Sequence, residues 1–141
     1  MRATIRNVRT PDDLAEFQRW LGQRRSALAV DLETSGFGWY GPDRIRTAQF
    51  GDAETGWVLT YDDWRGAVRH VLADYDGPLV GHNIGFDLHF LCADLGLTHD
   101  DLPWHRIHDT MLMAQMVDPT RPKGLKPLSA RFISPEAVAG Q

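Results

Sequence analysis

Residues 27–36 read ALAVDLETSG, an apolar segment that ends in two acidic residues and a turn. We predict a buried strand over residues 27–33, and side chains two positions apart on a strand lie on the same face. Asp31 and Glu33 therefore project together near the end of this strand. Neighbouring carboxylates repel each other unless a cation joins them, and oxygen ligands suit Mg²⁺ or Mn²⁺. The same pattern also fits a strand whose last acids simply face water.

The rest of the chain alternates strand and helix signals, which predicts an α/β fold. Gly51 to Gly56 is a link of hairpin length, so the strands on either side of it should run antiparallel. Besides a short strand at residues 3–8, we predict a mixed five-stranded sheet flanked by helices. Its strands are expected at 27–33, 44–51, 56–61, 79–81 and 104–108. Helices are expected from Pro11, over 62–74, from Asn83 to Leu95, from Asp109 and from Gly124 to Phe132.

Composition limits what the chain can do. Its 141 residues favour one domain, residues 1–141, and its net charge of −4 argues against coating duplex DNA by charge alone. Cys92 is the only cysteine in the sequence, which excludes an internal disulfide and favours a reducing compartment, the cytoplasm. No apolar run approaches the ~20 residues of a membrane helix. We expect a monomer without membrane contact.

A second motif, LVGHNIGFDLHFL at residues 79–91, places a strand against the start of a helix. Asp87 falls in the first turns of that helix, and neighbouring strand ends bring such loops to one crevice, where Asp87 can face the acids of strand 27–33. Asn83 lies at the turn, and Phe86 is an aromatic on which a base can stack. Taken singly, Asn83 is also a helix cap, Phe86 a core residue, and Asp87 a favourable charge near a helix N-terminus.

These motifs resemble the 3′–5′ exonuclease (proofreading) domain of family A DNA polymerases, phage versions in particular. AVDLETSG resembles the first motif of that family, with Asp31 and Glu33 as its acids, and GHNIGFD resembles the second, with Asp87. Residues 108–119 and 124–141 are similar to the segments that follow. The wider group of DEDD exonucleases includes RNase D. The resemblance implies a ribonuclease H-like fold, a single-stranded DNA 3′ end as substrate, and a polymerase domain in the same or a companion chain.

The resemblance also implies roles for individual residues in a site for two Mg²⁺ or Mn²⁺ ions. Asp31 would bridge both ions, Glu33 would bind one ion and accept from the terminal 3′ hydroxyl, and Asp87 would serve the second ion, partly through water. Thr34 would offer a backbone N–H to the substrate, and Phe37 would wedge against the terminal bases, although it also fits loop packing. Neither motif gives a role to the neighbouring Trp39 and Tyr40.

The family's third motif, Tyr-x-x-x-Asp or His-x-x-x-x-Asp on a later helix, has no suitable match in residues 1–141. None of the three tyrosines is followed by Asp four positions later, and Asp109 resembles a helix cap rather than a ligand. We therefore expect one Mn²⁺ site rather than two, and exonuclease activity that is low or absent in these residues alone. An RNase D-like 3′–5′ exoribonuclease and a non-catalytic nucleic-acid-binding fragment are the alternative hypotheses.

Overall fold

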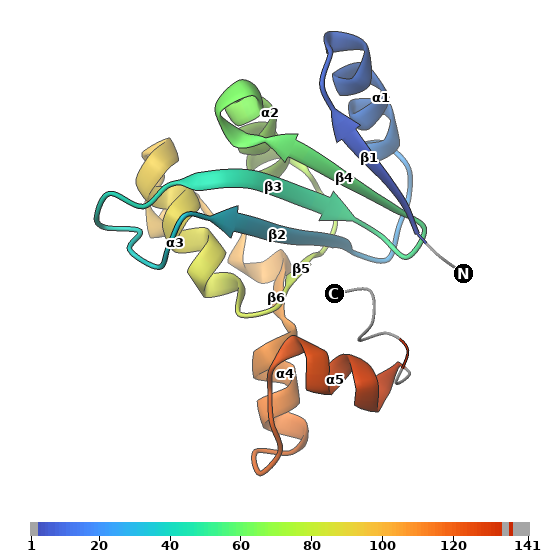
Figure 1. Cartoon of the computed structure of the whole chain (residues 1–141), viewed down its shortest axis with the longest axis vertical. Helices are drawn as coiled ribbons and strands as arrows, with labels where there is room; N and C mark the ends of the chain where they lie inside the picture. The colour runs from blue at the N-terminus through green and yellow to red at the C-terminus, as the bar shows by residue number, and fades with distance from the viewer. Residues whose placement is uncertain (1–2, 134–135, 137–141) are drawn as a thin grey trace.

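The computed structural model describes residues 3–133 and 136. Six strands form one sheet in the order β1-β4-β3-β2-β5-β6 (Figure 1). The strands are β1 (Thr4–Val8), β2 (Leu28–Thr34), β3 (Ile45–Gly51), β4 (Thr55–Thr60), β5 (Leu79–Gly81) and β6 (Ile107–Asp109). The helices are α1 (Pro11–Leu21), α2 (Tyr61–Asp74), α3 (Ile84–Leu95), α4 (Thr110–Val117) and α5 (Leu125–Phe132).

The sheet is mixed, as predicted. Strands β2, β3 and β4 form an antiparallel meander, whereas β5 is parallel to β2 and β6 is parallel to β5. The predicted count of five strands is wrong, because Thr4–Val8 joins the sheet as a sixth strand, parallel to β4. Only Val8 of this edge strand is buried, so its sequence carries little of the apolar alternation that marks a core strand.

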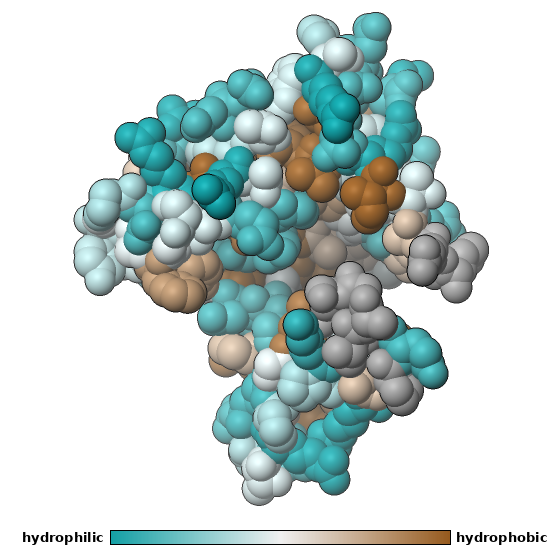
Figure 2. Space-filling model, viewed as in Figure 1, coloured by the Kyte–Doolittle hydropathy of each residue, from teal (hydrophilic) through white to brown (hydrophobic). Residues whose placement is uncertain are grey.

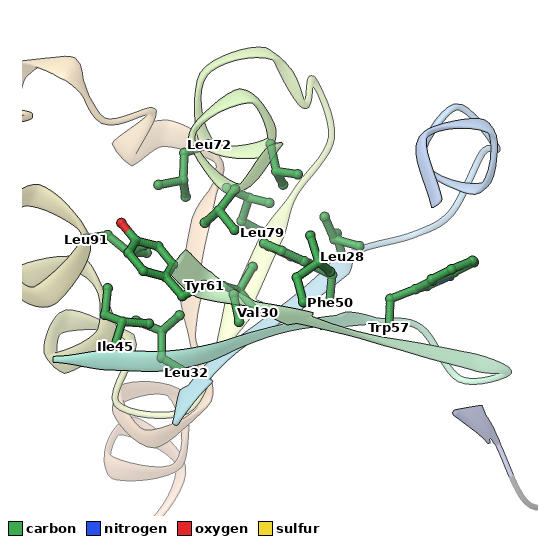
Figure 3. Close-up of a cluster of buried hydrophobic side chains, with 14 of the residues drawn as sticks. Leu28, Val30, Leu32, Ile45, Phe50, Trp57, Tyr61, Leu72, Leu79 and Leu91 are labelled. Atoms are coloured by element: carbon green, nitrogen blue, oxygen red, sulfur yellow. The ribbon is translucent and has the colours of Figure 1, made fainter. Parts of the chain in front are cut away.

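One face of the sheet carries the main hydrophobic core. Leu28, Val30 and Leu32 of β2 point into it and pack with buried side chains from α1, α2 and α3. Figure 3 shows this layer, with side chains from β2, β3, α2 and α3 meeting above the sheet. Because side chains alternate along a strand, Ala29, Asp31 and Glu33 lie on the opposite face, and these are exposed.

Local signals explain most element boundaries. The Thr10 side chain caps α1 in a reciprocal capping box with Asp13, and Pro11 occupies the first turn. Helix α3 ends at Gly96, which has a φ of 66°. Residues 104–106, predicted as strand, form a 3₁₀ turn before β6, because β6 is only as long as its partner β5.

Helices α4 and α5 lie apart from the main core, beyond β6 (Figure 1). A mainly apolar hollow of about 330 Å³ runs between the two helices. Hydrophobic surface is also exposed over the β1–β4 edge of the sheet (Figure 2). No helix in the described part of the chain is long and apolar enough to cross a membrane.

Candidate active site

Strand β2 presents the first two acids. Buried and exposed residues alternate along it, which places Asp31 and Glu33 together on the open face of the sheet. A register shift against β3 falls between Glu33 and Thr34, so regular pairing ends where the acids lie. Such irregularities bend a strand locally and re-aim the side chains beside them.

Helix α3 presents the third acid. Asp87 lies in its first turn, and its side chain is 4% exposed. Its Oδ2 atom is buried and has no hydrogen-bond partner. A buried carboxylate oxygen without a donor is costly, because water no longer solvates it and no protein group replaces that water. This orphaned oxygen fits a cation ligand.

The acids influence one another electrostatically. Burial, followed by the charges of Asp31, Asp109 and Glu33, raises the pKa of Asp87 from 3.8 to about 7. Asp31 is reached by solvent, yet enough protein surrounds it that burial, and next the charge of Glu33, raises its pKa as well. Unfavourable effects of this kind are relieved when a divalent cation binds between carboxylates.

The acids do not form a finished metal cage. Among the described residues, no three His, Cys, Asp or Glu side chains are arranged closely enough to hold an ion as they stand. The charges of Asp31 and Glu33 nevertheless both raise the pKa of Asp87. The site is therefore a set of acids that lie close enough to repel one another. Their oxygen-only chemistry suits Mg²⁺ or Mn²⁺.

Asp109 holds the turn that leads into Asp87. Its side chain caps α4, as predicted, by accepting from the backbone of Met111 at 2.8 Å. The same carboxylate also accepts from the backbone N–H groups of Asn83 at 3.0 Å and Ile84 at 3.1 Å. One side chain therefore fixes the starts of both α3 and α4. Sequence reasoning missed this second role, although Asp109 pairs with Gly81 once β5 and β6 are aligned.

Asn83 differs from its predicted role as a side-chain cap. Its backbone is left-handed, with a φ of 53°, and its side chain makes no capping hydrogen bond. Asparagine tolerates this conformation better than most residues. The bonds from Asp109 stabilise the turn instead, so Asn83 shapes the turn before Asp87 and its amide group remains exposed.

Among the predicted substrate-contacting residues, Thr34 directly follows Glu33 and Phe86 directly precedes Asp87. The Thr34 hydroxyl donates to the carbonyl of Gly36 at 2.7 Å, which ties down the start of the β2–β3 loop. Phe37, which is 86% exposed, meets Phe86 edge to face with ring centroids 6.0 Å apart. Phe86 in turn packs on Phe90. Phe37 and Phe86 are thus brought together, whereas loop packing would have buried Phe37.

The chain matches a family model described as 3′–5′ exonuclease over residues 5–140. It belongs to the 3′–5′ exonuclease domain family. This exonuclease domain is 37% identical to the DNA polymerase of Mycobacterium phage D29, over 94% of the chain and 23% of that polymerase. The chain thus spans about a quarter of the length of this relative. Members of the family generally depend on divalent metal ions.

Solved structures of nucleases share the fold of this exonuclease domain. NrnC of Brucella melitensis with bound Mg²⁺ matches with a TM-score of 0.67 at 20% identity, over 94% of this chain and 62% of that one. RNase D of Escherichia coli, an exoribonuclease, matches with a TM-score of 0.66 at 19% identity, over 94% of this chain and 34% of that one. These matches confirm the predicted ribonuclease H-like architecture.

Proposed function

We propose that Asp31, Glu33 and Asp87 bind divalent cations, Mg²⁺ or Mn²⁺, and that the domain removes nucleotides from the 3′ end of single-stranded DNA. The carrying observation is the Asp87 carboxylate, which is buried, unpaired at Oδ2 and close enough to Asp31 for the two charges to interact. A cation is the partner that would satisfy all three acids at once. The Mg²⁺ bound to NrnC, which shares the fold, supports this choice of ion.

Asp31, Glu33 and Asp87 would hold the metal, which would supply an activated water and positive charge for the leaving 3′ oxygen. The chain's own residues would place the substrate. Glu33 would accept from the terminal 3′ hydroxyl, and Phe37 with Phe86 would stack on the terminal bases. Asp109, through its bonds to the turn at Asn83, would keep Asp87 aimed at the acids of β2. Thr34 would add its backbone N–H beside the substrate.

The relatives also support a context for this activity. Because the phage D29 relative is a DNA polymerase of which this chain spans about a quarter, we propose that the domain edits DNA ends beside a polymerase domain. Its place would then be the cytoplasm of a bacterium or of a phage-infected host. Residues 1–141 would form a single exonuclease-like unit that lacks the helix of the third motif.

Calorimetric titration with Mn²⁺ tests the metal centre directly. We expect one detectable site, which Asp31→Asn and Asp87→Asn each weaken at least tenfold. Asp100→Asn is the matched control, because the Asp100 side chain is fully exposed in a separate turn. Two tight sites, or an affinity indifferent to Asp31→Asn, would show that the metal centre lies elsewhere.

Trimming of a 3′-labelled single-stranded DNA, with Mn²⁺ or with chelator, tests the reaction. We expect any trimming to require the ion and to be lost in Asp31→Asn. A matched oligoribonucleotide separates DNA from RNA preference, because the 2′ hydroxyl is the difference between them. Equal or faster cleavage of RNA would favour the RNase D-like alternative. Mn²⁺ binding with no cleavage of either strand would favour the non-catalytic alternative.

A further inference from the structure

The β2–β3 loop carries two aromatic residues that the proposed site does not use. Residues 35–44 project beyond the sheet, beside α3 (Figure 1). Phe37 belongs to the proposed site, but Trp39 and Tyr40 follow it on the same loop. Tyr40 is 83% exposed and Trp39 is also exposed. A soluble surface rarely presents three large aromatic side chains within four residues without a partner for them.

The loop is built around one carboxylate. Asp43 accepts from the backbone N–H of Gly38 at 2.9 Å and from the Ser35 hydroxyl at 3.1 Å. A Cβ added at Gly36 would lie 2.5 Å from Asp43 Oδ1, so the chain wraps closely around this side chain. The Ser35 hydroxyl also accepts from the backbone of Arg44. The aromatic residues are therefore held on a defined loop.

Two aromatic pairs lie along α3. Phe37 contacts Phe86, and Trp39 stacks on His89 with ring centroids 4.7 Å apart and planes 11° apart. Phe86 and His89 are three residues apart on α3, so they lie on the same side of the helix with their Cβ atoms about 5–6 Å apart. The two ring pairs therefore lie next to each other along the helix. The Tyr40 ring meets Trp39 edge to face at 5.5 Å and extends the second pair outward.

A hollow of about 360 Å³ opens beside Trp39. Arg44 and Arg65 line it together with three carboxylates, Asp43, Asp62 and Asp94, and Arg65 is paired with Asp94. Arg44 is exposed at its edge. An aromatic wall with polar groups around it suits a nucleobase, whose face stacks while its edge and sugar stay hydrated.

We infer that Trp39 and Tyr40 form a second base-stacking site for single-stranded DNA, next along the strand from the base held by Phe37 and Phe86. This inference rests on the proposed function. Stacking on aromatic rings tolerates any base, because every base has a π-face. The site would therefore add affinity for strand length without adding sequence preference.

Binding of thymidine monophosphate and of oligothymidylates of two to six nucleotides tests the inference. The oligonucleotides carry a 3′-terminal phosphorothioate linkage, and Mn²⁺ is present throughout. We expect Tyr40→Ala and Trp39→Ala each to weaken binding of the tetranucleotide about tenfold and that of the mononucleotide less than twofold. Tyr40 is 83% exposed, so Tyr40→Ala should leave the stability of the fold within about 0.5 kcal/mol of the wild type, which urea denaturation checks.

Trp104→Ala is the matched control. Trp104 also stacks on a histidine, His99, with centroids 4.5 Å apart, but it lies in the 3₁₀ turns before β6. We expect it to bind every length like the wild type. Trp39→Phe should restore most of the affinity, while losing the tryptophan fluorescence change that the tetranucleotide causes in the wild type.

The outcomes separate the inference from the proposed function. If the wild type binds the tetranucleotide and Trp39→Ala and Tyr40→Ala bind it equally well, the second stacking site is overturned and the proposed function stands. An equal loss for the mononucleotide and the tetranucleotide would also overturn it, because Trp39 would then only support Phe37. If the wild type binds no oligothymidylate, both fail.

Discussion

Helices α3 and α4 are similar in composition and opposite in environment. Both are rich in apolar residues, IGFDLHFLCADL in α3 and TMLMAQMV in α4. Six side chains of α3 are buried, whereas none of α4 is. Helix α3 packs on β2 and β6, while α4 lies beyond the sheet with α5 and exposes Leu112, Met113, Met116 and Val117. Apolar composition makes burial favourable, but a packing partner determines whether burial occurs.

The difference bears on the site. The buried helix carries Asp87, so the acid is held against a packed core and its position is fixed on several sides. The exposed helix meets the site at its start, through its N-cap Asp109, which is the last residue of β6. The acids thus stand on the packed part of the molecule. The start of α4 is joined to it by the Asp109 carboxylate and by the Thr110 hydroxyl, which donates to the carbonyl of Gly81 at 3.3 Å and lies 3.0 Å from His82 Nδ1.

The largest expected effect is the loss of a core contact on α3. Leu91 is 1% exposed and Leu112 on α4 is 59% exposed. We expect Leu91→Ala to lower the free energy of unfolding by about 2–5 kcal/mol, and Leu112→Ala by less than about 0.5 kcal/mol, because only the first leaves a cavity. Urea denaturation of both variants measures this. Equal losses would mean that α4 is packed as tightly as α3.

The next effect is a pH dependence that comes from Asp87. Its pKa is about 7 in the folded chain against 3.8 unfolded, so the folded state holds the proton more tightly. The resulting stabilisation is full below about pH 4 and is lost as the pH rises through 7. In chelator, the free energy of unfolding should therefore fall from pH 4 to 7, by at most about 4 kcal/mol for this group.

Asp87→Asn should remove that slope, which urea denaturation at several pH values can show. Asp118→Asn, at the end of α4, is the control. Hydrogen bonds from Thr120 lower the pKa of Asp118, so its contribution is present above about pH 4 and is lost on acidification. It should leave the slope between pH 4 and 7 unchanged. A wild-type slope that persists in Asp87→Asn would assign the effect to another group.

Removal of the Asp109 side chain, which bonds the starts of both α3 and α4, should have a smaller effect on the free energy of unfolding. Asp109→Ala deletes the acceptor for Asn83, Ile84 and Met111. We expect it to cost about 1–2 kcal/mol, as loss of a helix cap does, and to weaken Mn²⁺ binding through the turn before Asp87. Urea denaturation and calorimetry measure the two effects. If Asp109→Ala lowers the free energy of unfolding as expected but leaves the Mn²⁺ affinity unchanged, Asp109 only caps the helices and does not position Asp87.

The smallest effect is expected from a polar substitution on α4. Met116 is 87% exposed. Met116→Gln should therefore change the free energy of unfolding by no more than about 0.5 kcal/mol, which thermal unfolding can check. Leu88→Gln places the same amide in the buried face of α3 and gives the contrast, because its loss of unfolding free energy should be as large as that of Leu91→Ala. A marked destabilisation by Met116→Gln would show that α4 is covered in solution.

The sequence by itself determined the α/β class, the antiparallel pair of β3 and β4, and the two motifs with their acids. It could do so because these features follow from local rules: alternation along a strand puts Asp31 and Glu33 on one face, and cap residues mark where α1 and α4 begin. The motifs also sufficed to predict the exonuclease family that the comparisons confirm. Residues 134, 135 and 137–141 of the predicted C-terminal segment lie outside the described residues.

Only the tertiary structure decided which partners those features meet. Strand β1 belongs to the sheet because it pairs with the free edge of β4. The sequence of β1 does not predict this pairing, because most of its side chains are exposed. The hold of Asp109 on Asn83 and the stacking of Trp39 on His89 join residues 26 and 50 positions apart. The raised pKa of Asp87 likewise depends on how deeply α3 is buried, because desolvation is a property of the packed surroundings rather than of neighbours along the chain.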